Sequence, residues 1–295
     1  MSKLSEKIRA KTFAITTELT PPKGIDLSDI FSKAQALKGL VDGINLTESP
    51  RARMAIEPKS VARLLLDRGI EPIVQFTARD RNRIALQSDI LGAAALGVSN
   101  VVFMTGDNPK NGDHPDAKPV FDLSTTEMLS AARTLRGGKD MAGNDLKGAP
   151  DLFIGATANP GSKDLAAEVE NTRRKIDAGA QFLQTQALYD APSLIRYVEA
   201  LKSDGIALLV GIIPLKSIKM ATWLNDNVPG IAVPHALLKE MESVAGDADA
   251  ELRKGIEIAA RIIKEVQSYC AGVHLMTMGW EKHIPAILRE AGLRV

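Results

Sequence analysis

Short apolar, β-branched segments alternate with amphipathic helical segments along the whole chain, from "TFAITTEL" near its start to "GVHLMTM" near its end. Segments of the first kind occupy residues 12–19, 43–47, 72–78, 100–106, 152–158, 182–188, 208–214 and 272–278. Such alternation is typical of repeated βα units, in which helices cover a parallel sheet. The pattern therefore predicts an α/β fold with eight strands.

Eight βα units in 295 residues fit a single (β/α)8 TIM barrel domain over residues 1–295. We expect extra helices at 235–243 and 250–269, between strands seven and eight. A doubly wound open sheet is the alternative, but no glycine-rich phosphate motif follows the first strand, which favours the barrel. The segment 135–150, rich in Gly and Asp, is expected to be an exposed excursion before strand five.

Composition excludes several classes of function. The 37 basic and 36 acidic residues leave no electrostatic footprint for nucleic acid or an anionic membrane. The one cysteine, Cys270, rules out an internal disulfide and cysteine-based metal or iron–sulfur sites, and we expect it to be a packed thiol near a helix end. The charged N-terminal stretch lacks a signal-peptide core, and no run of about 18 apolar residues occurs. We expect a soluble cytoplasmic protein.

Polar residues recur where the predicted strands end. Side chains two apart on a strand share a face, and barrel active sites form at the C-terminal ends of the strands. Same-face polar pairs end six predicted strands in succession: Thr16 and Glu18, Asn45 and Thr47, Gln75 and Thr77, Thr105 and Asp107, Thr157 and Asn159, Gln184 and Gln186. Because an unpaired buried polar group costs about 1 to 3 kcal/mol, this rim predicts a wet, ligand-binding mouth.

Two carboxylates are candidate catalytic groups. In "TTELTPPKG", Pro21 and Pro22 cannot donate to a sheet ladder, so they end the first strand and leave Glu18 at the mouth. The structural alternative is that Glu18 pairs with Lys23 or Arg79. In "FMTGD", Gly106 lets the backbone bend so that Asp107 lies at the strand end, where it either meets a ligand or caps a loop.

Other chemistries have weaker signals. His114, His235, His274 and His283 show no metal-binding spacing, and we predict no catalytic metal. No GxSxG elbow occurs. Lys216, just past "GIIPL", is the lysine nearest to the position that a Schiff-base lysine would need, but we expect it to face solvent or an anionic ligand.

Asn171, Arg174 and Lys175 share one helix face, which either binds a phosphate or is simply solvated.

The stretches "TELTPPKG", "FMTGDNP", "RRKIDAGAQFLQTQALYD", "VGIIP" and "GVHLMT" resemble the methylenetetrahydrofolate reductases, in order over nearly the whole chain. The short reductases of acetogenic bacteria and the reductase half of bifunctional homocysteine methyltransferase fusions look most similar. The resemblance implies a flavin held at the mouth of the barrel, which transfers a hydride from its N5 to 5,10-methylenetetrahydrofolate and forms 5-methyltetrahydrofolate in one-carbon metabolism and methionine biosynthesis.

The resemblance also implies roles for individual residues. Glu18 matches the general acid that protonates folate N10, and Asp107 matches the aspartate between flavin and pterin. Gln186, with Gln184 on the same strand, matches the substrate-binding glutamine. The implied cofactor-binding set is Thr47, Gln75, Thr77, Thr105, Gly106, Asp107, Asn171, Arg174 and Lys175, the last three on the phosphate and adenosine side.

Several points stay open at this level. The cofactor is FAD or FMN, or there is no flavin and NADH transfers its hydride directly. The donor is NADH, NADPH or a partner subunit of an electron-transfer complex, and a pterin-binding methyltransferase barrel is a more distant alternative. After strand five the sequence has "TANPGSKD" where enteric relatives have Tyr-Pro and His-Pro, and Trp280 and Ile218 replace an Arg and a Phe that contact folate. The physiological direction and the oligomeric state, including a homo-oligomer, are also open.

Overall fold

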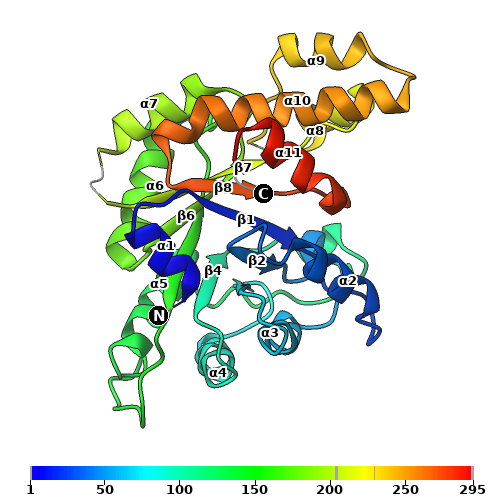
Figure 1. The fold of residues 1–295 in the computed structure, drawn as a ribbon. Helices are drawn as coiled ribbons and strands as arrows, with labels where there is room; N and C mark the ends of the chain where they lie inside the picture. The colour runs from blue at the N-terminus through cyan, green and yellow to red at the C-terminus, as the bar shows by residue number, and fades with distance from the viewer. Residues whose placement is uncertain (1, 203–204, 229, 294–295) are drawn as a thin grey trace.

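Parallel strands close into a barrel in the computed structural model, which describes residues 2–202, 205–228 and 230–293 (Figure 1). The strands pair in chain order, and β8 returns to pair with β1. They are β1 Ala14–Leu19, β2 Gly43–Leu46, β3 Pro72–Thr77, β4 Asn100–Met104, β5 Phe153–Ala158, β6 Phe182–Ala187, β7 Ala207–Ile212 and β8 Gly272–Leu275. Each lies in or within one residue of a predicted segment, so the barrel is confirmed and the open sheet was wrong.

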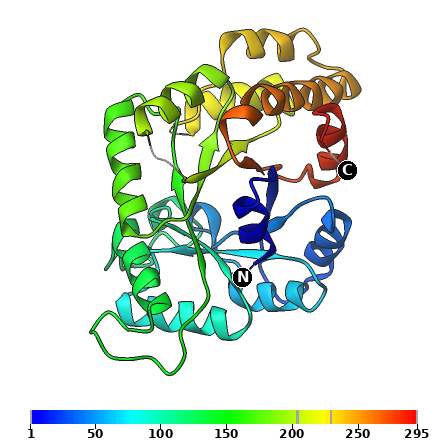
Figure 2. The ribbon, with the colours of Figure 1, turned by 60° about the vertical axis from the view of Figure 1, so that its left-hand side comes forward.

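Helices surround the barrel (Figure 2). Those that follow the strands are α2 Ser28–Leu37, α3 Pro58–Leu66, α4 Arg83–Ala95, α5 Thr125–Arg136, α6 Leu165–Ala178, α7 Ala191–Leu201, α8 Ile218–Asn227 and α11 Ile284–Glu290. The predicted extra helices between β7 and β8 are confirmed as α9 His235–Glu242 and α10 Ala248–Val266. They lie with α8 along one side of the barrel (Figure 1).

Polar side chains cap the N-termini of several helices that follow the strands. Ser124 and Glu127 form a reciprocal capping box on α5, and the side chains of Asn82 and Asp190 cap α4 and α7. These caps satisfy the first free backbone N–H groups of each helix. The start of each of these helices is therefore fixed, whether the loop before it is short, as before α7, or long, as before α5.

An N-terminal helix closes the floor of the barrel, which the charged sequence there did not lead us to predict. Helix α1, Lys3–Arg9, starts at Ser2, whose hydroxyl accepts from the backbone N–H of Ser5 at 3.0 Å. Leu4 is fully buried in a cluster with Ile73, Val102 and other side chains that point into the barrel. Leu4, with Ile8 packed beside it, therefore covers this end of the barrel interior.

Aromatic packing fills the lower half of the barrel. The rings of Phe153 and Phe182 stack with their centroids 4.7 Å apart. A Cβ at Gly155 would lie 2.4 Å from the Phe182 ring, far inside van der Waals contact. Gly155 is therefore the position that makes room for this pair.

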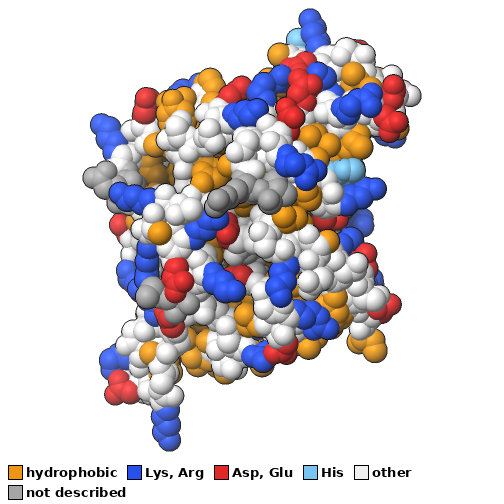
Figure 3. All heavy atoms as spheres, viewed as in Figure 1, with side chains coloured by type: hydrophobic (Ala, Val, Ile, Leu, Met, Phe, Trp, Pro, Cys, Tyr) orange, Lys and Arg blue, Asp and Glu red, His pale blue; other side chains and the backbone are white. Residues whose placement is uncertain are grey.

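The chain surface carries no dominant charge on the face that Figure 3 shows, where acidic and basic side chains are intermingled. The predicted excursion is confirmed: after α5, residues 137–150 form a mostly exposed loop that is closed by an antiparallel bridge between Lys139 and Asp145. Within the described residues, every helix is too short or too polar to span a bilayer.

Filling the space beside Phe182 is expected to destabilise the fold. Gly155→Ala forces a methyl group against the ring and lowers the free energy of unfolding by roughly 1 to 3 kcal/mol. The matched control is Gly92→Ala on α4, where nothing lies within 4 Å of the new Cβ and helix propensity favours alanine by up to about 1 kcal/mol. Urea unfolding followed by circular dichroism measures both. Equal stability of Gly155→Ala and the parent chain would contradict this account of the floor.

Candidate active site

A cavity of about 480 Å³ opens at the C-terminal ends of the strands. It brings together most of the polar positions that the sequence pattern singled out. They are Glu18, Thr47, Gln75, Gly106, Asp107, Thr157, Asn159, Lys175, Gln184 and Gln186. Thr20, Pro50, Met104, Ala158, Glu168, Thr185, His274 and Met276 complete its lining. The predicted polar rim therefore lines a cavity, and its polar groups come from the ends of β1 to β6, from β8 and from α6.

Glu18 lies at the mouth with a quarter of its side chain exposed. Its carboxylate faces His274, with 3.8 Å between Glu18 Oε2 and His274 Nε2. The structural alternative for Glu18 was wrong, because Lys23 pairs with Asp113 at 2.6 Å and Arg79 pairs with Asp80 at 2.7 Å. Glu18 is thus free of the cations expected to hold it and is directed toward the cavity.

A hydrogen-bonded layer lies beneath Glu18 inside the barrel. The amides of Asn45 and Gln184 exchange two hydrogen bonds across the interior, from Asn45 Nδ2 to Gln184 Oε1 at 2.7 Å and from Gln184 Nε2 to Asn45 Oδ1 at 3.0 Å. Both side chains are buried. Gln184 was expected to contact substrate directly, but its amide is committed to Asn45, while Gln186 lines the mouth above it.

Asp107 lies on the rim and is exposed. Its Oδ2 accepts a hydrogen bond from the backbone N–H of Arg51 at 2.8 Å, so it ties the loop after β2 to the loop after β4. Gly106 has a φ of +84°, and a Cβ there would lie 2.8 Å from Thr77 Cβ. The loop-capping interpretation of Asp107 is therefore correct in this structure, and Asp107 also lines the cavity.

A buried ion pair that the sequence analysis missed supports this side of the mouth. Glu48 is buried and accepts from both guanidinium NH groups of Arg81, each at 2.6 Å, and from the backbone N–H and hydroxyl of Thr77 at 2.6 and 2.8 Å. Burial lowers the pKa of Arg81, but the hydrogen bonds and charges of Glu48 and Asp89 more than offset this and raise it above its ordinary value. Arg81 therefore stays charged.

Two threonines expected to bind the cofactor lie elsewhere. Thr77 is buried and its hydroxyl donates to Glu48, so it does not line the cavity. Thr105 is exposed, and its hydroxyl lies 3.2 Å from that of Thr125 on α5. The strand β4 ends at Met104, so the two-residue alternation stops before Thr105 and no longer directs its side chain inward.

The charged face of α6 is divided between cavity and solvent. Lys175 is buried, lines the cavity and donates to the carbonyl oxygen of Thr157 at 2.8 Å. Burial lowers the pKa of Lys175, which the charge of Glu168 only partly offsets. Asn171 is half-buried, with its amide nitrogen 3.4 Å from Glu168 Oε2, whereas Arg174 is exposed and outside the lining.

One polar atom in the lining has no partner. Asn159 Oδ1 is buried without a hydrogen-bond partner among the described residues. An unpaired buried acceptor is costly, and in a ligand cavity it indicates a donor supplied by the ligand. Within the same described ranges, no group of three or more His, Cys, Asp or Glu side chains is placed to hold a metal ion.

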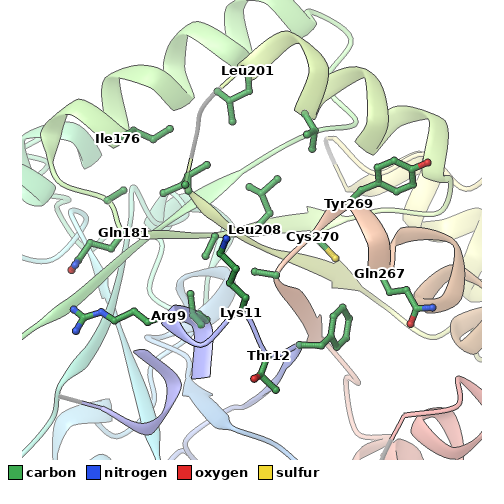
Figure 4. Close-up of a pocket in the computed structure, with 18 of the residues that line it drawn as sticks. Arg9, Lys11, Thr12, Ile176, Gln181, Leu201, Leu208, Gln267, Tyr269 and Cys270 are labelled. Carbon is green, nitrogen blue, oxygen red and sulfur yellow. The ribbon is translucent and has the colours of Figure 1, made fainter. Parts of the chain in front are cut away.

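A second cavity, of about 930 Å³, lies at the opposite end of the barrel (Figure 4). Its lining includes Arg9, Lys11, Gln181 and Tyr269, but none of the predicted site residues. Cys270, also in this lining, donates weakly to Val266 O at the end of α10, which confirms a packed thiol near a helix end, and burial raises the pKa of this thiol to about 11.

Lys216 is also removed from the cavity at the mouth. It is half-buried, and its Nζ donates to the carbonyl oxygen of Met278 at 2.5 Å and lies 5.7 Å from the centre of the Trp280 ring. Its side chain is therefore partly exposed, as expected for a lysine that faces solvent. Lys216 also ties the loop after β7 to the loop after β8.

Breaking the ion pair behind the mouth is expected to destabilise the protein strongly. Glu48→Gln leaves the buried Arg81 guanidinium with less compensating charge, and we expect a loss of about 3 kcal/mol in the free energy of unfolding. The matched control is Asp67→Asn, which removes an exposed pair with Arg63 and should cost less than about 1 kcal/mol. Chemical unfolding measures both. Similar small losses for the two variants would show that the Glu48 pair does not hold the mouth.

Comparison with known sequences supports one family. The sequence profile described as methylenetetrahydrofolate reductase matches residues 3–292. A 5,10-methylenetetrahydrofolate reductase of Pectobacterium carotovorum is 23% identical over 95% of this chain and 90% of its own length. One of Salmonella typhimurium is 26% identical over 77% of this chain and 72% of its own.

Eukaryotic relatives are much longer than this chain. Methylenetetrahydrofolate reductase 2 of Schizosaccharomyces pombe is 23% identical over 76% of the chain, but the match spans only 36% of that protein. Among solved structures, a protein from Clostridium thermocellum that binds two copies of 5-methyl-5,6,7,8-tetrahydrofolic acid has a TM-score of 0.64 at 18% identity, over 98% of both chains. That likeness concerns the fold.

Proposed function

Because this chain belongs to the methylenetetrahydrofolate reductase family, we propose that it is an oxidoreductase that reduces 5,10-methylenetetrahydrofolate to 5-methyltetrahydrofolate, or runs this reaction in reverse. The observation that carries the proposal is the position of Glu18. It is a carboxyl group at the mouth of the barrel, without a cation partner of the kind expected for a structural ion pair, beside a cavity lined by amides and hydroxyls. Residues 1–295 are proposed to act as one domain.

The residues of the mouth fit a flavin and a pterin. Both are flat heteroaromatic rings with donors and acceptors along their edges, and the lining offers the Thr47 hydroxyl, the amides of Gln75 and Gln186 and the unpaired Asn159 Oδ1. Lys175, a cation in the same lining, would meet a phosphate. A bound flavin, FAD or FMN, would supply the hydride and would in turn be reduced by NADH or NADPH.

The protein's own contribution is to place a proton and orient the substrate. Glu18, as a carboxylic acid, would protonate folate N10, so that the five-membered ring opens to an iminium ready to accept a hydride. Gln186 would hydrogen-bond the pterin edge. Asp107 would fix the rim loops over the ligands through its bond to the Arg51 backbone.

The reaction is best tested in two half-reactions under anaerobic conditions. The purified chain is mixed with FAD or FMN, reduced with NADH, and then given methylenetetrahydrofolate while the flavin absorbance is followed. Bleaching followed by folate-driven recovery is the expected result. Bound flavin that only a chemical reductant bleaches would indicate an electron-donating partner, and NADH consumption with folate but without flavin would indicate direct hydride transfer. No folate turnover by any route would overturn the proposal.

Glu18→Gln separates the proton step from flavin chemistry. The amide cannot give a proton to N10, so we expect folate-driven reoxidation to slow by roughly 100-fold or more, whereas flavin binding and reduction by NADH stay near the parent values. Asp113→Asn, which breaks the rim pair with Lys23, is the matched control and should leave reoxidation within a few fold. Full reoxidation by Glu18→Gln would exclude Glu18 as the acid.

Lys175 is expected to hold the charged part of the flavin. Lys175→Met should raise the dissociation constant for FAD by roughly 10-fold or more, because a hydrogen bond from a charged group to phosphate is lost. Arg174→Met removes the same charge from the exposed face of α6 and is the matched comparison. Flavin fluorescence titration measures both. A larger effect from Arg174→Met would place the phosphate outside the cavity.

A further inference from the structure

His274 lies directly beneath Glu18, and the sequence analysis did not assign it a role. It stands on β8 with its side chain turned into the barrel, where it is 3% exposed. Thr16, on the neighbouring strand β1, is its register partner, and Glu18 is two residues further along the same strand. The imidazole therefore has one ring nitrogen in the buried layer and the other facing the Glu18 carboxyl.

The buried layer determines which ring nitrogen carries the hydrogen. Gln184 Nε2 donates to Asn45 Oδ1 and lies 3.4 Å from His274 Nδ1, so it offers Nδ1 its second hydrogen. The Thr16 hydroxyl lies 3.0 Å from the same Nδ1, and its single hydrogen can be donated either to Nδ1 or to Val273 O at 3.3 Å. In the orientation that the structure gives the Gln184 amide, one of its Nε2 hydrogens faces Nδ1, and this orientation makes Nδ1 an acceptor. A neutral imidazole with an accepting Nδ1 carries its hydrogen on Nε2.

We propose that His274 is a positioning residue for Glu18: Asn45 and Gln184 hold it in the Nε2–H tautomer, and its Nε2–H is directed at Glu18 Oε2. The 3.8 Å between these two atoms is longer than a hydrogen bond in the ligand-free site. Contacts of this kind often shorten only when substrate is bound. A small rotation of the half-buried Glu18 side chain closes the gap.

This arrangement determines which carboxyl oxygen meets the ligand, an inference that rests on the proposed folate reduction. An N–H donor at Oε2 leaves the acidic hydrogen on Oε1, the oxygen that Glu18 would then present to a ligand in the cavity. After Glu18 gives this proton to folate N10, the same N–H stabilises the carboxylate that remains. In this role the imidazole donates a hydrogen bond and exchanges no proton itself.

The tautomer is measured independently of activity. A two-bond 1H–15N correlation spectrum of the imidazoles distinguishes Nε2–H from Nδ1–H, and the chain has only four histidines. The signals of His274 are those that disappear in His274→Gln. We expect the neutral Nε2–H form, and an Nδ1–H form would overturn the proposal.

The kinetic test uses two polar replacements of similar size. His274→Gln places an amide N–H close to the position of Nε2, whereas His274→Asn is too short to reach Glu18. We expect His274→Asn to slow the folate half-reaction by roughly 10- to 100-fold, with little change in the KM for folate or in flavin reduction. His274→Gln should recover most of this rate. Equal rates in both variants, whether fast or slow, would overturn the proposal.

A double variant links the effect to Glu18. If His274 acts through that carboxyl, adding His274→Asn to Glu18→Gln should cause almost no further loss, whereas independent structural damage would add to it. Melting temperatures of all variants check that they fold. Failure of the parent chain to turn over folate would count against the proposed function alone, and the tautomer spectrum would then still support or overturn the placement of His274.

Discussion

The two hydrogen bonds between Asn45 and Gln184 are the interaction on which the site depends. They join β2 to β6 across the inside of the barrel. An amide buried there without a hydrogen-bond partner would lower the stability of the fold. Because each amide satisfies the other, the barrel can hold a polar layer at the depth where other barrels place aliphatic side chains. This polar layer contacts His274, whose other ring nitrogen faces Glu18.

Charged groups outside the barrel also hold specific parts of the mouth in place. Glu48 and Arg81 lie behind the ends of β2 and β3, and their contacts with Thr77 fix the backbone from which Gln75 projects. Asp107 then joins the rim loops on the next side. The mouth is thus held from below by neutral amides and from the side by charged groups, and only the upper surface is left for ligands.

The periodicity of the sequence was sufficient to predict the barrel, its strands and most of the mouth, since strand alternation dictates which side chains point inward. It failed where alternation ends, as at Thr105, which lies just beyond β4. It also failed where a role depends on a distant partner: nothing near Glu48 in the chain indicates Arg81, and nothing near His274 indicates Gln184. Leu4 escaped prediction because Leu4 and Ile8, in a short charged stretch, are too few to establish a helical period.

The loop at residues 137–150 follows α5 and precedes β5, so it lies at the end of the barrel opposite the mouth (Figure 1). It is mostly exposed, and its Lys139 to Asp145 bridge closes it on itself. A fluorophore, an affinity tag or a surface linker attached at its tip would leave the mouth of the barrel unobstructed. The protein could therefore be immobilised through this loop with the mouth of the barrel facing solution.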